Sequence, residues 1–218
     1  MRLPFSSIAR CLRAKPSPES AAWDAAHGVE TARIRRLHGL TTVGTSRGRG
    51  HRYEASSPDG FHEAMRALPI THGDFTFVDL GSGKGRCLLM AEEWGFREII
   101  GIEFALELHR SALQNLGRGH HPTIRAVHAD AADYELPPGP LVLYVYNPFD
   151  AGLLQGILAR AVVPRRELHL VLFAGWSFRG VAEECGFVVE GRTPHALLMR
   201  ARDRQRLGTT LDAAGTET

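Results

Sequence analysis

The residues best suited to chemistry lie in one short stretch, where an apolar run reaches Asp79 and a turn follows with glycine at positions 81, 83 and 85. Glycine has no Cβ and adopts positive φ easily, so such a turn lets backbone N–H groups approach a ligand closely. Residues 87–94 are predicted to be helical, and a helix N-terminus adds a partial positive charge. The stretch therefore predicts a site for a nucleotide-type cofactor.

The spacing of these glycines separates three classes of cofactor site. A phosphate-binding loop requires Gly-x-x-x-x-Gly-Lys-Ser/Thr, but here glycine follows Lys84. A dinucleotide fingerprint, Gly-x-Gly-x-x-Gly, requires glycine at position 86, where the chain has Arg86. Phosphate binding is therefore not expected and NAD binding fits less well. An ordinary strand-to-helix turn would need one glycine instead of three.

Two further acids follow predicted strands. Residues 97–104 form an apolar run that contains Glu103 at its end, and residues 123–128 form a shorter run that precedes Asp130. In nucleotide-binding α/β folds, an acid at the end of the second strand accepts hydrogen bonds from the ribose hydroxyls. Glu103 is the candidate for that role. The alternatives are a solvated strand end for Glu103 and an ordinary loop residue for Asp130.

A fourth predicted strand, residues 141–146, runs into Asn147, Pro148 and Phe149. The strand is apolar on both faces, as expected for a central strand of a parallel sheet that helices cover on each side. Asn-Pro also commonly starts a turn, so the residue types alone leave the role of this segment open.

The predicted strands alternate with helices from residue 58 onward. Ser57 and Pro58 have the residue types of an N-cap and a first helical position, so a helix is expected before the first strand. Residues 187–202 are predicted to form a final pair of strands. The pattern predicts an α/β fold with a doubly wound, mostly parallel sheet.

Together these segments resemble class I, or seven-strand, S-adenosylmethionine (SAM) dependent methyltransferases. The acid before Gly-x-Gly-x-Gly is similar to motif I of that family, and the Asn-Pro-Phe segment is similar to motif IV of its amino-directed members, with one proline missing. The chain looks like a bacterial group of largely unassigned substrates and, more distantly, protein lysine methyltransferases, including the mitochondrial type that acts on the ATP synthase c subunit. The likeness covers about residues 24–200 and is carried by Arg52–Pro58, Val78–Arg86, Gly101–Phe104, Glu107–His109 and Tyr146–Phe149.

The resemblance implies a Rossmann-like fold of seven strands, with the last one antiparallel, and roles for individual residues. Asp79 would help to place the cationic methionine end of SAM, and Asp130 would meet the adenine amino group. Tyr53 would close over the cofactor, although a half-buried packing role is the alternative for this ring. The implied cofactor-binding residues are Asp79, Gly81, Ser82, Gly83, Gly85, Glu103, Phe104, Asp130, Ala131 and Asn147, and the implied catalytic residues are Asn147, Pro148, Phe149 and Tyr53.

The activity that the resemblance implies is methyl transfer from SAM, with an amino group of a protein lysine or a small amine as the leading acceptor. The missing proline keeps two alternatives open, O-methylation of a small molecule and methylation of RNA, although no RNA-binding module is recognisable. A scaffold protein that binds SAM without transferring a methyl group is the non-enzymatic alternative. We expect an unidentified methyl acceptor as partner, and no nucleic acid or membrane partner.

The chain is expected to divide into a basic N-terminal extension that acts as a lid (residues 1–57), a methyltransferase domain (residues 58–205) and a disordered tail (residues 206–218). Residues 1–53 contain ten Arg or Lys against three acids, so they could meet an acidic partner or form a solvated arm. No long insertion follows the later strands. We therefore expect the extension to fold over the bound cofactor and to be mobile without it.

Composition sets further bounds. The three cysteines are widely spaced and suggest reduced thiols without metal-ligand spacing, so no metal site is expected. No run of 18 apolar residues occurs, so no membrane span is expected, and we predict a cytoplasmic protein. Residues 1–20 are loosely similar to a transit peptide but lack the apolar segment of a secretion signal, which leaves a targeting role open.

Overall fold

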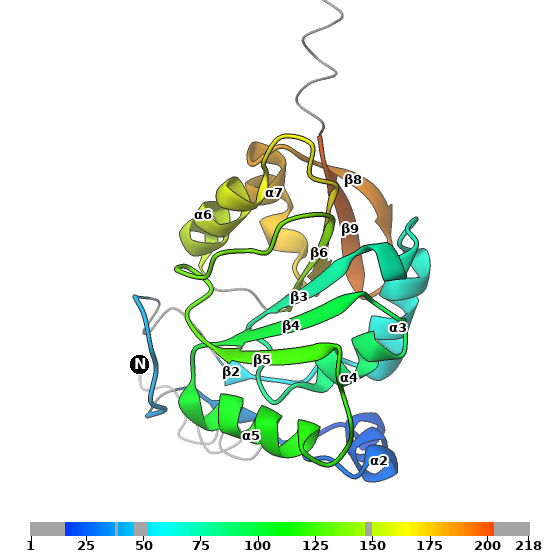
Figure 1. Cartoon of the computed structure of the whole chain (residues 1–218), viewed down its shortest axis with the longest axis vertical. Helices are drawn as coiled ribbons and strands as arrows, with labels where there is room; N and C mark the ends of the chain where they lie inside the picture. The colour runs from blue at the N-terminus through cyan, green and yellow to red at the C-terminus, as the bar shows by residue number, and fades with distance from the viewer. Residues whose placement is uncertain (1–15, 38, 46–51, 147–149, 203–218) are drawn as a thin grey trace, which may run out of the picture.

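The computed structural model describes residues 16–37, 39–45, 52–146 and 150–202, with Arg52 described by its backbone alone. Its centre is a seven-stranded sheet in which β9 runs antiparallel to its neighbours β7 and β8 and the other neighbouring strands are parallel (Figure 1). This sheet confirms the predicted fold class. Across the sheet the strands are β5 (Ile124–His128), β4 (Glu98–Glu103), β3 (Thr76–Leu80), β6 (Leu141–Tyr146), β7 (Leu168–Phe173), β9 (Ala196–Ala201) and β8 (Phe187–Arg192).

The central strands are apolar throughout because their side chains alternate between two cores, one on each face of the sheet. In β6, Leu141, Leu143 and Val145 belong to one core. Val142 and Tyr144 belong to the other. The buried acids of β3 and β4, Asp79 and Glu103, lie near the carboxyl ends of these strands.

Helices cover both faces. α6 (Ala151–Ala161) and α7 (Arg179–Glu184) contribute to the first core, and α3 (Pro58–Ala67) and α4 (Arg86–Glu92) contribute to the second. α5 (Leu106–Leu116) packs beside β4 and β5. The domain also contains two short 3-10 helices, η2 (His72–Asp74) and η3 (Trp176–Phe178). α3 begins as predicted, because the Ser57 hydroxyl accepts a hydrogen bond from the Gly60 amide at 3.2 Å and Pro58 occupies the first turn.

The strand order reverses at β3, with β4 and β5 on one side and β6 on the other. In open α/β sheets, ligands bind beyond the carboxyl ends of the strands at such a switch point. The predicted site residues follow β3, β4, β5 and β6. The fold therefore gathers them along one edge of the sheet.

The N-terminal residues lie against this domain. α2 (Pro18–His27) ends at Gly28, which has φ 66°, and an antiparallel ribbon follows from β1 (Arg35–Arg36) and β2 (Arg52–Tyr53). Figure 1 shows α2 close to α5. Across the described parts of the chain, none of the helices combines the length and the apolar character that crossing a membrane requires.

Candidate active site

The turn after β3 has the geometry that its glycines predict. Gly81, Gly83 and Gly85 all have positive φ, at 90°, 55° and 85°. The amides of Gly81 and Ser82 both donate to the Ile102 carbonyl, at 2.9 and 3.0 Å, which fixes the turn to the neighbouring strand β4. Residues with a Cβ rarely adopt these φ values, so the three glycines make this turn possible.

Glu103 holds the same turn from the end of β4. Its Oε2 atom accepts a hydrogen bond from the Gly83 amide, and its Oε1 atom accepts one from the Ala105 amide, both at 2.8 Å. Burial raises the pKa of Glu103 to about 7, against the lowering effect of these amides. In this conformation the Glu103 carboxyl group holds the glycine turn through the Gly83 amide. The sequence did not predict this contact.

Asp79 is the second buried acid at the switch point. Its side chain lies at the end of β3, where the residue is 4% exposed. Burial, and then the nearby charge of Glu103, raises the pKa of Asp79 to about 8. The carboxyl group therefore carries a proton near neutral pH unless a cation approaches it.

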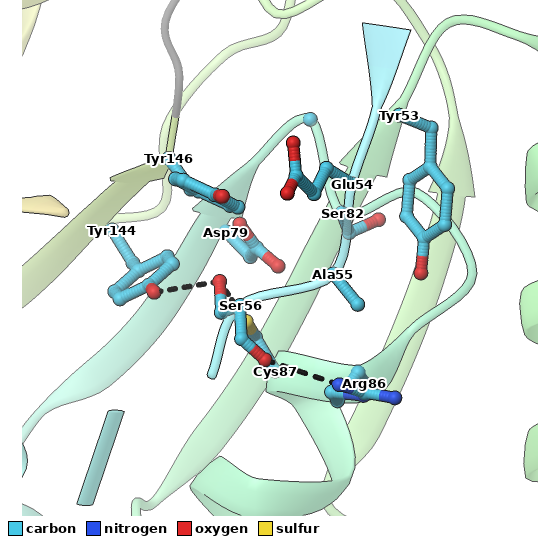
Figure 2. Close-up of a pocket in the computed structure, with 11 residues that line it drawn as sticks. Tyr53, Glu54, Ala55, Ser56, Asp79, Ser82, Arg86, Cys87, Tyr144 and Tyr146 are labelled. Carbon is cyan, nitrogen blue, oxygen red and sulfur yellow. Dashed lines mark hydrogen bonds between the residues drawn. The ribbon is translucent and has the colours of Figure 1, made fainter. Parts of the chain in front are cut away.

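A cavity of about 60 Å³ opens beside Asp79, between the carboxyl ends of β3 and β6 and residues 53–56 (Figure 2). Its walls combine carboxyl groups, hydroxyl groups and aromatic rings. The lining residues are Tyr53, Glu54, Ala55, Ser56, Asp79, Gly81, Ser82, Arg86, Cys87, Tyr144 and Tyr146.

Three polar side chains form a buried cluster in this wall. The Tyr144 hydroxyl lies 2.8 Å from Ser56 Oγ, and Cys87 Sγ lies 3.4 Å from the same atom. Cys87 and Tyr144 also interact with each other, so the three groups can satisfy one another inside the wall. Burial raises the pKa of the Cys87 thiol strongly, so this sulfur stays protonated and is a poor nucleophile.

Ser82 lines the same cavity with an unsatisfied donor. Its hydroxyl oxygen is buried and has no hydrogen-bond partner among the described residues. Buried polar groups are rarely left without partners, and a site that binds a polar ligand is one reason for such an exception. The cavity is thus lined by a buried carboxyl group, Asp79, and by a hydroxyl group without a partner in the described part of the chain, Ser82.

The other predicted cofactor residues lie at the next strand ends. Phe104 is buried in a small apolar cluster with Ala105 and Leu108. Asp130 is buried after β5, where its Oδ1 atom accepts a hydrogen bond from the Ala132 amide at 2.9 Å, and Ala131 packs in the first core. All of them lie on the predicted edge of the sheet, and their contacts with a cofactor stay predictions.

The predicted acceptor residues Asn147, Pro148 and Phe149 lie outside the described residues. Tyr53 lies against the glycine turn, so closely that a Cβ at Gly83 would collide with its ring. Its hydroxyl donates a hydrogen bond to the Thr31 carbonyl at 2.7 Å. Tyr53 thus packs on the glycine turn, and both its closing over the cofactor and its catalytic role stay predictions.

Sequence reasoning missed Arg86, which is buried at the start of α4. Its guanidinium donates to Thr31 Oγ1, to the hydroxyl and carbonyl of Ser20, to the Ser56 carbonyl and to Asp24 Oδ1, at 2.6 to 3.2 Å. The sequence did contain one signal for Arg86. It places a cation in the first turn of a helix that packs on the sheet, and a buried charge of this kind needs an acidic partner. The partners are 30 to 66 positions away in sequence, which no local pattern reveals.

Lys84, between two of the glycines, makes a similar contact. Its ammonium group donates to both carboxylate oxygens of Glu30, at 2.9 and 2.7 Å, and to the Arg33 carbonyl at 3.0 Å. Burial lowers the pKa of Lys84, while the Glu30 carboxylate opposes that effect. Both cations of the motif thus face the N-terminal residues.

Neither a protein-family model nor a curated protein matches this chain. Solved structures do: mitomycin 7-O-methyltransferase MmcR has a TM-score of 0.54 at 18% identity, over 67% of this chain and 54% of that one. A putative S-adenosylmethionine dependent methyltransferase from Listeria monocytogenes has a TM-score of 0.50 at 12% identity, over 67% of this chain and 100% of that one. A predicted N6-adenine-specific DNA methylase from Listeria monocytogenes str. 4b F2365 has a TM-score of 0.53 at 14% identity, over 77% of this chain and 53% of that one.

The matched part of this chain thus spans about half the length of the first and the third of these proteins. At such low identity the similarity shows the fold. The chain has the seven-strand, Rossmann-like fold of class I methyltransferases, as its motifs predict.

Proposed function

We propose that the protein binds SAM and transfers its methyl group to an amino group. The observation that carries the proposal is the arrangement of two buried carboxyl groups, Asp79 and Glu103, around the glycine turn at the switch point of a class I methyltransferase fold. The names of the similar structures point to the same class of reaction.

The chemistry of the cavity suits the amino-acid end of SAM. The Asp79 carboxyl group can ionise to pair with an ammonium group, and ion pairs of this kind form strong hydrogen bonds. The buried hydroxyl of Ser82, which has no hydrogen-bond partner among the described residues, can donate to the carboxylate. Glu103 and Asp130 are then available for the ribose and the adenine, as the family resemblance implies.

The other wall of the cavity supports an amine as acceptor. Figure 2 shows the Glu54 carboxylate between Tyr146 and Ser82, and the Tyr144 ring lines the cavity as well. A carboxylate with aromatic rings attracts a cation, which favours a protein lysine or a small amine over a hydroxyl group. Asn147 directly follows Tyr146 in the sequence, and its amide oxygen would accept a hydrogen bond from the nitrogen. O-methylation and RNA methylation are the competing outcomes of the test.

SAM supplies a methyl group that its positive sulfonium already activates. The chain's own residues therefore have to align the acceptor and exclude water. Asn147 and Glu54 would orient the acceptor nitrogen toward the cavity. A protonated amine must also lose a proton before it can attack, and Glu54 or bulk solvent would accept it.

Calorimetry with SAM, S-adenosylhomocysteine and NAD tests the cofactor. We expect the first two to bind and NAD not to bind. Asp79→Asn should weaken S-adenosylhomocysteine binding by roughly 10- to 100-fold, since it removes a charge-assisted hydrogen bond. Asp74→Asn is the matched control, because Asp74 is exposed just before the amino end of β3. If the native protein bound neither SAM nor S-adenosylhomocysteine, the proposal would be refuted.

A labelled-methyl screen tests the acceptor. Native protein is incubated with labelled SAM and, in parallel, with a cell extract treated with ribonuclease, a protein-free extract and purified RNA. Label in protein lysines or in small amines supports the proposal. Label confined to hydroxyl groups or to RNA would overturn the amine assignment while leaving methyl transfer intact.

A further inference from the structure

Residues 39–45 and Tyr53, which we call the cover, lie over the ends of β3, β4 and β5. The Val43 amide donates to the Phe104 carbonyl at 3.1 Å, and the Leu106 amide donates to the Thr41 carbonyl at 2.8 Å. Thr42 forms an antiparallel bridge with Ala105 between these two bonds. The cover thus pairs with the backbone directly after Glu103, as a short added strand would.

Side chains and close backbone approaches strengthen this contact. Leu40, Val43 and Tyr53 pack on the small apolar cluster around Phe104 and Leu108. Gly44 lies so close to Asp130 that a Cβ at position 44 would collide with the Asp130 side chain. The cover therefore touches residues at three of the positions that the family resemblance assigns to the cofactor, namely Gly83, Phe104 and Asp130.

The cavity beside Asp79 is too small to hold a whole nucleotide-type cofactor. The cavity beside Asp79 measures about 60 Å³. Sites for small molecules and cofactors usually measure roughly 300–1,000 Å³. The amino-acid end of a ligand can reach this cavity, but the ends of β4 and β5, where the adenosine belongs, are occupied by the cover.

Anchors fix the chain on both sides of the cover. Before it, Asp24 accepts hydrogen bonds from the amides of Thr31 and Ala32 at 2.6 Å and pairs with Arg86 at 2.9 Å. After it, the Ser56 carbonyl accepts a hydrogen bond from the same guanidinium at 3.2 Å. A displacement of the cover therefore leaves its two anchors in place.

We propose that the cover is an internal competitor of the cofactor: it occupies the adenosine part of the site in the unliganded protein and must leave it when SAM binds. This inference rests on the proposed cofactor site and goes beyond it. It differs from the lid expected from the sequence, which closes over the ligand and is loose without it. A ligand's apparent affinity falls with the fraction of molecules in the binding-competent state, so a weaker cover means tighter binding.

Calorimetry with S-adenosylhomocysteine on full-length variants tests whether weakening the cover tightens ligand binding. Leu40→Ala and Val43→Ala remove apolar contacts between the cover and the Phe104 cluster, and each should tighten binding by about 3- to 10-fold. Leu113→Ala is the matched control, because Leu113 is 49% exposed on α5 and lies outside that cluster. Its affinity should equal that of the native protein.

Hydrogen exchange gives a second readout. Saturating S-adenosylhomocysteine should speed exchange at the Val43 and Leu106 amides, whose bonds join the cover to the sheet edge. The Leu89 amide, which donates to the Gly85 carbonyl in α4, should not change.

Each outcome decides a separate point. Tighter binding by the two cover variants, with faster exchange, supports the competitor. Equal or weaker binding, or slower exchange at Val43 and Leu106, overturns it and leaves the cofactor proposal standing. If neither the native protein nor a variant binds S-adenosylhomocysteine, the proposed function fails and the inference fails with it.

Discussion

The Asp79 carboxyl group couples the proposed cofactor site to pH. Its pKa is about 8 in the unliganded protein, and an ammonium group beside it would favour the ionised form. Binding should therefore release a proton. S-adenosylhomocysteine should bind more tightly as pH rises from 6 to 8, by at most about tenfold per pH unit, because one pKa unit corresponds to about 1.36 kcal/mol. Calorimetry across this range measures the effect.

Two controls isolate Asp79. Adenosine lacks the ammonium group, so its affinity should vary less over the same pH range, and the change that remains reports Glu103, whose pKa of about 7 lies in this range. Asp79→Asn cannot release a proton at this position and should flatten the profile of S-adenosylhomocysteine. A native profile that is already flat, or that falls toward pH 8, would contradict the assignment of Asp79 to the ammonium group.

We expect Asn147 to act mainly on the acceptor, so that its substitution separates acceptor binding from cofactor binding. Asn147→Ala should lower methyl transfer by about 10- to 1,000-fold, as expected for a contact made mainly in the transition state. Affinity for S-adenosylhomocysteine should stay within a few-fold, and this serves as the internal control. Full turnover by the variant would place the acceptor elsewhere on the sheet edge.

Individual residues differ in how far the sequence predicts them. Asp79 and the three glycines could be predicted because one local pattern contains both the strand and the turn. Glu103 could be placed at a strand end, but its bond to the Gly83 amide joins residues 20 positions apart. The Ser56 and Tyr144 contact spans 88 positions, so the polar cluster became visible only in the fold.

At the scale of elements, the sheet was predictable and the N-terminal packing was not. Apolar runs bounded by turns indicate β3, β4 and β6 directly, since both faces of these strands are buried. α2 contains Asp24, but nothing in its own sequence indicates that this acid pairs with Arg86 after the glycine turn. The described N-terminal residues are packed through this pair, and the expected mobility of the extension without cofactor stays a prediction.

The pair between α2 and α4 should contribute strongly to stability. In Asp24→Asn the Arg86 side chain, which is 1% exposed, loses its counter-charge. Breaking one partner of a buried ion pair costs about 3–5 kcal/mol. The free energy of unfolding, measured by urea denaturation, should fall by an amount of that order.

An exposed pair provides the comparison. Arg179 and Glu183 lie one turn apart on α7, with side chains 59% and 43% exposed. Glu183→Gln should therefore change the free energy of unfolding by less than about 0.5 kcal/mol. Equal effects of the two substitutions would mean that the α2 contact is not the buried anchor that its geometry indicates.

For the whole molecule, the question is where the folding unit begins. The expected boundary at residue 57 stays a prediction, yet Ser20, Asp24 and Thr31 supply most of the partners of Arg86, and Glu30 pairs with Lys84. Residues 18–32 therefore satisfy two cations beside the glycine turn. A unit that begins at residue 58 would leave both cations without these partners.

Two truncations locate this boundary. A chain that lacks residues 1–15 keeps Ser17, whose hydroxyl accepts a hydrogen bond from the Ser20 amide and caps α2, so it is the reference in which α2 and both ion pairs are intact. A chain that lacks residues 1–32 leaves Arg86 and Lys84 buried without their acids and should unfold at a clearly lower temperature, because unpaired buried charges are costly. Calorimetric melting of the three proteins at equal concentration makes the comparison. If removal of residues 1–32 lowered the thermal midpoint no more than removal of residues 1–15 does, the two ion pairs would not hold the N-terminal residues in the folding unit. The same conclusion would follow if both truncated chains melted like the full chain.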